Sequence, residues 1–180
     1  MTKRITIASR AIGLVLVAGS LAVGAWADDN AAILSSTLIG SAPQQVIGGV
    51  NSGGLPWTVS QARVTLHRNG KINVELDGLV LVSLGTPGPI TAVSATLVCG
   101  GSGGTVAGTT AGVTLTVAGN AHISDKIAPP ASCIAPVVLV RAAAVNGTPL
   151  AQPGPFIAAT GFNNTSAENE PDKHDSADRF

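Results

Sequence analysis

The segment from Ala62 to Asp77, ARVTLHRNGKINVELD, constrains the fold more than any other part of the chain. Apolar and polar residues alternate on both sides of an Asn-Gly pair, which is the period of a half-buried strand and predicts a β-hairpin. A two-residue loop would set apolar residues against polar ones along the whole ladder. A three-residue loop from Arg68 to Gly70 instead pairs Leu66 with Ile72. We therefore expect the longer loop, with Gly70 in a left-handed conformation.

Residues 1–27 have the pattern of a secretory signal peptide. Lys3, Arg4 and Arg10 flank or precede an apolar block, residues 11–25, that is shorter than the roughly 20 residues of a membrane-spanning helix. Ala25-Trp26-Ala27 then matches a small-x-small cleavage site. We expect cleavage after Ala27, a secreted or periplasmic protein, and no membrane span in the mature chain. An uncleaved anchor is the alternative.

The charge of the mature chain argues against one class of partner. Three of the ten basic residues lie in the signal peptide, whereas all ten acidic residues follow it, so the exported chain is net acidic. It has no basic patch that could neutralise a phosphate backbone, and we expect no nucleic-acid partner. A protein or a component of the cell envelope remains open as the partner.

Cys99 and Cys133 are the two cysteines of the chain, and both follow the predicted cleavage site. In an oxidising compartment the expected outcome is one disulfide. Cys99 ends an alternating segment on its apolar side, so its side chain should face the core. Two cysteines without a neighbouring histidine or a second cysteine pair make a poor metal site.

Turn residues divide residues 28–162 into about eight short apolar or alternating segments, none with helical periodicity. This spacing predicts an all-β domain, an antiparallel β-sandwich of about eight short strands with one disulfide. Gly48, Gly49 and the residues up to Pro56 should form a long, flexible connection. It leads to Trp57, which we expect to fill the core. Residues 163–180 are polar and acidic without alternation, which predicts a disordered tail.

A second hairpin is expected around Ala118-Gly119-Asn120, with Val117 opposite Ala121 and Leu115 opposite Ile123. Asp125 follows Ile123 by two residues and so lies on the same face of the strand, where its carboxylate would point toward the core. An unpaired charge there would cost several kcal/mol, so either a bulge changes the phase or the strand lies at a sheet edge.

Two possible catalytic or metal sites can be read from the sequence. His67 and His122 fall on polar faces, and two imidazoles on neighbouring strands could bind copper or zinc with Asp125 or Asp77 as a third ligand. Nothing in their spacing requires a metal, and we favour the interpretation that they are ordinary solvated histidines. We therefore assign no metal or other cofactor and keep these residues as weak candidates.

Gly100-Gly101-Ser102-Gly103-Gly104 matches the G-x-S-x-G pattern of serine hydrolases. That pattern needs a strand-to-helix turn in an α/β sheet, whereas here a glycine loop is expected between two β segments. Ser102 is therefore a weak candidate nucleophile. Carbohydrate binding has little support, because only three aromatic residues, Trp57, Phe156 and Phe162, lie between the signal peptide and the tail.

The region from Gly53-Gly54-Leu55-Pro56-Trp57 through Cys99 and Cys133 to Gly161-Phe162 resembles a group of uncharacterised small, Gly- and Ala-rich secreted bacterial proteins with one Cys pair. The resemblance implies export and the sandwich, and it brings no catalytic or binding residue. We expect an exported, non-enzymatic β-sandwich that serves as a surface, matrix or ligand-binding module. A metal-binding protein or metal-dependent enzyme using the strand histidines, and a serine hydrolase, are the alternatives.

Overall fold

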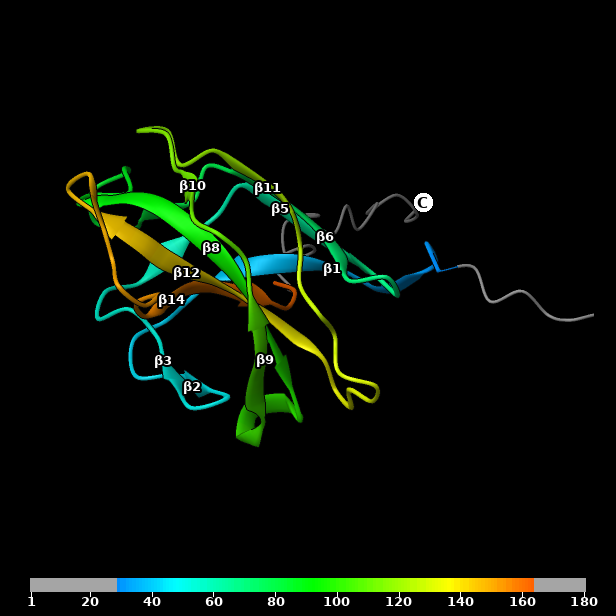
Figure 1. The fold of residues 1–180 in the computed structure, drawn as a ribbon. Coiled ribbons are helices and arrows are strands. Elements are labelled where there is room, and N and C mark those ends of the chain that lie inside the picture. The colour runs from blue at the N-terminus through cyan, green and yellow to red at the C-terminus, as the bar shows by residue number, and fades with distance from the viewer. Residues whose placement is uncertain (1–28, 164–180) are drawn as a thin grey trace, which may run out of the picture.

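The computed structural model describes residues 29–163 as an all-β fold (Figure 1). The predicted signal peptide and, apart from Asn163, the predicted tail lie outside the described residues. The helical content of the described part is one 3-10 turn, η1 (Gly101–Gly103). The strands are β1 (Ala32–Gly40), β2 (Val46–Ile47), β3 (Val50–Asn51), β4 (Trp57–Thr58), β5 (Gln61–His67), β6 (Lys71–Asp77), β7 (Val80–Leu81), β8 (Ile90–Cys99), β9 (Thr105–Thr109), β10 (Val113–Thr114), β11 (Ala121–Lys126), β12 (Val137–Val145), β13 (Thr148–Pro149) and β14 (Phe156–Thr160).

Ten of these strands form one antiparallel sheet that curls into a half-barrel (Figure 1). The strand order is β10-β8-β12-β14-β1-β5-β6-β11, with β9 beside β8 and β13 beside β12. The all-β class and the antiparallel pairing are confirmed, but the two separate sheets of a sandwich are not. The reason lies in β1, which pairs with β14 through residues 38–40 and with β5 through residues 32–37. It thus joins a hairpin half (β1, β5, β6, β11) to a β8 half (β8, β9, β10, β12, β13, β14).

The β5–β6 hairpin has the predicted register. Leu66 pairs with Ile72, and Arg63 pairs with Glu75, across a loop in which Gly70 has a φ of 85°. A Cβ at Gly70 would lie 1.9 Å from the carbonyl oxygen of Ile127. Glycine is therefore required here both for the left-handed backbone and for the close approach of the following chain.

One hydrophobic core fills the inside of the curled sheet, and both halves contribute to it. Trp57 is 7% exposed and packs in this core, as predicted. Its largest fully buried members include Leu66, Ile72, Leu97 and Ile123. Because neither half could bury its apolar face alone, the curl of the sheet is what makes the domain stable.

A small second core lies on the other face of the β8 half, where β2 and β3 cover β8, β12 and β14. Gly48 and Gly49, with φ of 59° and 74°, form a tight turn between β2 and β3, and the Gly48 N–H donates to the Ser102 carbonyl at 2.9 Å. Part of the expected connection is thus a short hairpin, which the sequence did not indicate because strands of two residues carry no readable periodicity. The buried residues of this cluster are Val50, Val98, Leu139, Phe156 and Ala159.

The second predicted hairpin is wrong in its pairing. β11 forms its ladder with β6, and β10 forms its ladder with β8. Only the turn is local, with the Thr116 N–H donating to the Asn120 carbonyl at 3.0 Å, while Val117 is 87% exposed. The two strands diverge after this turn because each belongs to a different half of the sheet. β11 is consequently an edge strand, which is one of the two arrangements that we expected to accommodate the carboxylate of Asp125.

The predicted disulfide is present between Cys99 at the end of β8 and Cys133 in the segment before β12, with the Cα atoms 5.0 Å apart. Both cysteines pack against the main core. Backbone bonds from Gly100 to Ile134 and from Gly101 to Ala135 continue the contact beyond the disulfide. The disulfide therefore attaches the long connection between β11 and β12, residues 127–136, to the end of β8.

Candidate functional site

The three candidate metal ligands do not come together. His67 ends β5 beside the hairpin tip, where its Nδ1 lies 2.6 Å from the Asn30 carbonyl oxygen, whereas His122 lies on β11 opposite Glu75. Two strand spacings and about four residues along the strands separate the two histidines, which is roughly 16 Å. Within residues 29–163, no three His, Cys, Asp or Glu side chains are grouped closely enough to hold a metal ion.

The carboxylate of Asp125 instead accepts hydrogen bonds from two backbone N–H groups. Its Oδ2 accepts from the Ala111 N–H at 2.9 Å, and its Oδ1 accepts from the Lys126 N–H at 2.7 Å. Ala111 lies between β9 and β10 in the β8 half, and β11 is the last strand of the hairpin half. The carboxylate thus bridges the seam between the two ends of the curled sheet, which is a structural role.

Ser102 lies in η1, the short turn that joins β8 to β9, so the glycine loop predicted for this segment connects two strands. No helix follows it, and its hydroxyl has no histidine or carboxylate partner among the described residues. The backbone carbonyl of Ser102 accepts a hydrogen bond from the Gly48 N–H and so holds the β2–β3 turn against this loop. The arrangement lacks the nucleophile, base and orienting acid of a hydrolase triad.

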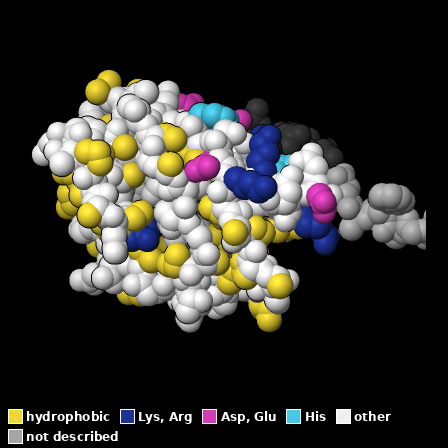
Figure 2. All heavy atoms as spheres, viewed as in Figure 1, with side chains coloured by type: hydrophobic (Ala, Val, Ile, Leu, Met, Phe, Trp, Pro, Cys, Tyr) yellow, Lys and Arg dark blue, Asp and Glu magenta, His cyan; other side chains and the backbone are white. Residues whose placement is uncertain are grey.

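Charge is concentrated on one half of the molecule. Figure 2 shows most of the charged side chains gathered over β5, β6 and β11, while the left and lower parts of the same view carry mostly uncharged and hydrophobic groups. Arg141 is the one Lys, Arg, Asp or Glu that the described part of the β8 half contains. Its guanidinium donates to the Gly154 carbonyl at 2.7 Å and to the Pro153 carbonyl, and burial lowers the pKa of Arg141. The remaining charges lie on or beside the hairpin half.

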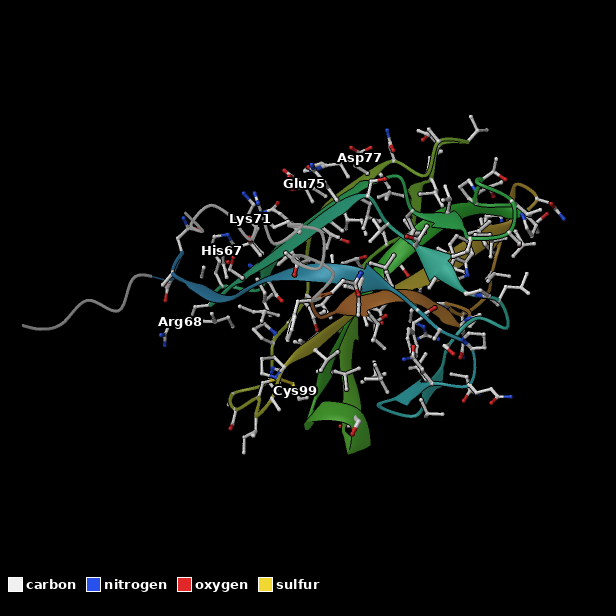
Figure 3. All side chains as sticks on the ribbon, turned by 180° about the vertical axis from the view of Figure 1, so that it is seen from behind. His67, Arg68, Lys71, Glu75, Asp77 and Cys99 are labelled. Atoms are coloured by element: carbon white, nitrogen blue, oxygen red, sulfur yellow. A yellow bond between two sulfur atoms is a disulfide. The ribbon has the colours of Figure 1, made fainter. Side chains whose placement is uncertain are left out.

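A groove of about 1040 Å³ crosses the outer face of the hairpin half. We call it the outer groove. A row of register partners, Thr37, Arg63, Glu75 and His122, runs through it from β1 to β11. Asp77 extends the polar lining along β6, and Figure 3 shows Glu75 and Asp77 following one another on this hairpin. Polar side chains from four adjacent strands thus line one part of the groove, and apolar residues such as Ile39 and Val59 line another.

The charged side chains of this groove have no internal partner. Arg63, Glu75, Asp77 and His122 are exposed, and no hydrogen bond or ion pair joins the side chain of any of them to another residue of the described part. Their Cβ spacing across the ladder would allow contact, but the long side chains extend separately into solvent. They remain available to a ligand.

Phe162 stands at the β1 end of the outer groove and is 80% exposed. The chain that leads to it is held in place, since the Thr37 hydroxyl donates to the Gly161 carbonyl at 2.6 Å and the Gly161 N–H donates to the Thr37 carbonyl at 3.1 Å. An aromatic ring therefore faces solvent beside the polar row.

The sequence predicts no groove, but it predicts that two of the residues lining it are neighbours. The Arg63–Glu75 pair follows from the hairpin register alone. His122 was considered only as a metal ligand, because its position beside Glu75 depends on β11 pairing with β6. Phe162 was placed at the end of the domain, and no local pattern indicates that it returns to β1.

Comparisons with protein-family models, with curated proteins and with solved structures find no match to this chain. Among the described residues, no helix has both the length and the hydrophobicity needed to cross a membrane. The chemistry of the outer groove is therefore the basis on which a function can be assigned.

Proposed function

We propose that the mature chain is an exported, non-enzymatic binding module and that the outer groove is its binding surface. The observation that carries this proposal is the set of exposed, unpartnered polar side chains in one depression: Arg63, Glu75, Asp77 and His122. A volume of about 1040 Å³ is at the upper end of what small-ligand sites occupy, so the groove suits a small ligand or a short stretch of a polymer.

Export is supported by the signal-peptide pattern of residues 1–27 and by the disulfide between Cys99 and Cys133, which is typical of oxidising compartments. An exported binding module would meet its partner in the cell envelope or outside the cell. A protein or another envelope component is therefore the partner class that we expect.

A binding role is favoured over catalysis by the solvation of the groove. Catalytic acids and bases are ordinarily buried or set beside a like charge that tunes them, whereas Glu75 and Asp77 are exposed on an open strand. Of the candidate ligands of a metal enzyme, His67 lies at the end of β5, whereas His122 and Asp125 lie on β11, and the structure does not group the three together.

Co-sedimentation with isolated cell envelopes of the source organism tests the proposal. The purified mature protein should sediment with the envelopes, and the double variant Glu75→Gln/Asp77→Asn should remain in the supernatant. Asp29→Asn is the matched control, because it also neutralises an exposed acid but lies outside the groove. Arg63→Gln and its control Arg68→Gln, at the exposed hairpin tip, repeat the comparison for a cation.

The variants change exposed side chains without internal partners, so their melting temperatures should match that of the parent protein. Equal sedimentation of the groove variants and their controls would overturn the assignment of the outer groove. Absence of sedimentation by the parent protein would overturn the envelope-binding module itself.

A further inference from the structure

We infer that the ligand of the outer groove is an uncharged carbohydrate, an inference that rests on the proposed function. The charges of the groove point to this class. The guanidinium of Arg63 and the imidazole of His122 lie beside two carboxylates, those of Glu75 and Asp77, so with histidine counted as neutral the net charge is 1 − 2 = −1. A groove of such small net charge attracts neither a polyanion nor a polycation strongly, while it offers many hydrogen-bonding groups to a neutral molecule.

The polar groups of the groove are suited to hydroxyl groups, which both donate and accept. Carboxylates accept, a guanidinium donates through a planar fork, and the amides of Gln61 and Asn120 do both. Glu75 and Asp77 are two residues apart on one strand face, a spacing of roughly 7 Å, and neighbouring strands are about 4.8 Å apart. This spacing is wider than that between adjacent hydroxyl groups of one sugar ring, so the lattice would contact hydroxyl groups on opposite sides of a ring or on neighbouring rings of a chain.

An aromatic platform completes the arrangement. Of the three aromatic residues in the described part, Trp57 is 7% exposed, Phe156 is fully buried, and Phe162 is 80% exposed. The one ring that the fold leaves in solvent is thus the one at the groove. The C–H faces of a sugar ring pack against an aromatic ring while its hydroxyl groups bond to polar neighbours, so an exposed ring beside a polar row fits a carbohydrate better than an ion.

The sequence alone gave little support to carbohydrate binding, because three aromatic residues in a whole domain are few. The fold changes this by placing one of them in the same groove as Thr37 and Arg63, which lie 125 and 99 residues earlier in the chain. A single ring suffices for binding when the polar contacts come from a preformed sheet, because such a sheet loses little conformational entropy when the ligand binds.

Chemical treatment of the envelopes tests the ligand class. Periodate oxidation followed by borohydride reduction destroys the vicinal diols of sugars, whereas protease digestion removes protein receptors. Binding of the mature protein should be lost after periodate and retained after protease, and it should be similar at low and high salt because the ligand is uncharged. Phe162→Ala should weaken binding by roughly tenfold, the factor expected for the loss of one stacked ring. Ile134→Ala, which removes an equally exposed apolar side chain outside the groove, should leave binding unchanged.

The possible outcomes separate this inference from the proposed function. Binding that survives periodate but is lost after protease would overturn the carbohydrate and leave the binding module intact. Periodate-sensitive binding that is lost at high salt would overturn the uncharged ligand. Release of reducing ends into the supernatant would confirm the ligand class and overturn the non-enzymatic role. Equal binding by Phe162→Ala and Ile134→Ala would remove the ring from the site and overturn the proposed mode of recognition.

Discussion

The carboxylate of Asp125 accepts a hydrogen bond from the backbone N–H of Ala111, 2.9 Å away, across the seam where the curled sheet does not close. No backbone ladder joins β10 to β11 among the described pairings, so this side chain supplies a link that a fully closed barrel would obtain from its own backbone. A charged acceptor on a backbone N–H is among the stronger hydrogen bonds.

Asp125→Ala should therefore destabilise the domain by about 1–3 kcal/mol, since the N–H groups of Ala111 and Lys126 both lose their acceptor. Asp125→Asn keeps one oxygen acceptor and should cost less. Urea unfolding measures the cost, and amide hydrogen exchange should become faster at Ala111 and Lys126 specifically. Unchanged exchange at Ala111 in Asp125→Ala would show that the link does not exist in solution.

Removal of the disulfide should have a larger effect. Cys99 and Cys133 are 34 residues apart in sequence, and the chain-entropy relation gives about 4 kcal/mol for a loop of this size. The double variant Cys99→Ala/Cys133→Ala should lose stability by that order in denaturant unfolding. Thiol titration of the exported protein under denaturing, non-reducing conditions should detect no free sulfhydryl, and two free thiols would contradict the bond.

Gly70→Ala and Gly147→Ala form a matched pair, because both glycines have a left-handed backbone, with φ of 85° and 78°. At Gly147 a methyl group meets no atom within 4 Å, so only the backbone strain of about 1 kcal/mol applies. At Gly70 the methyl group would also clash with the Ile127 carbonyl, and we expect a loss of about 3 kcal/mol. Equal losses in thermal or urea unfolding would mean that the chain after β11 does not pack over the hairpin loop.

Signal cleavage after Ala27 is the fourth prediction. The intact mass of the exported protein should correspond to a chain that begins at Asp28, because Ala25-Trp26-Ala27 provides the small residues that signal peptidase requires. Recovery from the membrane fraction of a chain that still begins at Met1 would indicate an uncleaved anchor instead.

The fold was predictable where a pattern is local. The β5–β6 register follows from alternation on both sides of one turn, since pairing Leu66 with Ile72 keeps all apolar residues on one face. The sandwich was not confirmed, because β1 changes its pairing partner near Leu38 and so connects the two halves. The alternation of apolar and polar residues along β1 is the same whichever strand lies beside it, so the sequence does not reveal this change. The β10–β11 pairing was wrong for a similar reason: local turn geometry at Thr116 was outweighed by non-local pairing with β8 and β6.

The candidate site was less accessible to sequence reasoning than the fold. Glu75 and Arg63 are near neighbours in sequence, and their shared face could be read from the hairpin. His122 and Phe162 join them only through the pairing of β11 with β6 and of β14 with β1. A binding surface assembled across four strands leaves no motif in the chain, because its members are set by sheet order rather than by spacing.

The concentration of charge on the hairpin half also determines how the protein can be attached to a sensor. Lys71 and Lys126, the two lysines of residues 29–163, are register partners at the hairpin tip. The Asn69 N–H donates to the Asp29 carbonyl at this tip, so the start of the described chain lies at the same end. Glu75 is about 13 Å further along β6. Amine coupling at Lys71 or Lys126 would attach the molecule by the hairpin tip, with the outer groove further along β6, provided that Lys173, which lies outside the described residues, is first changed to arginine.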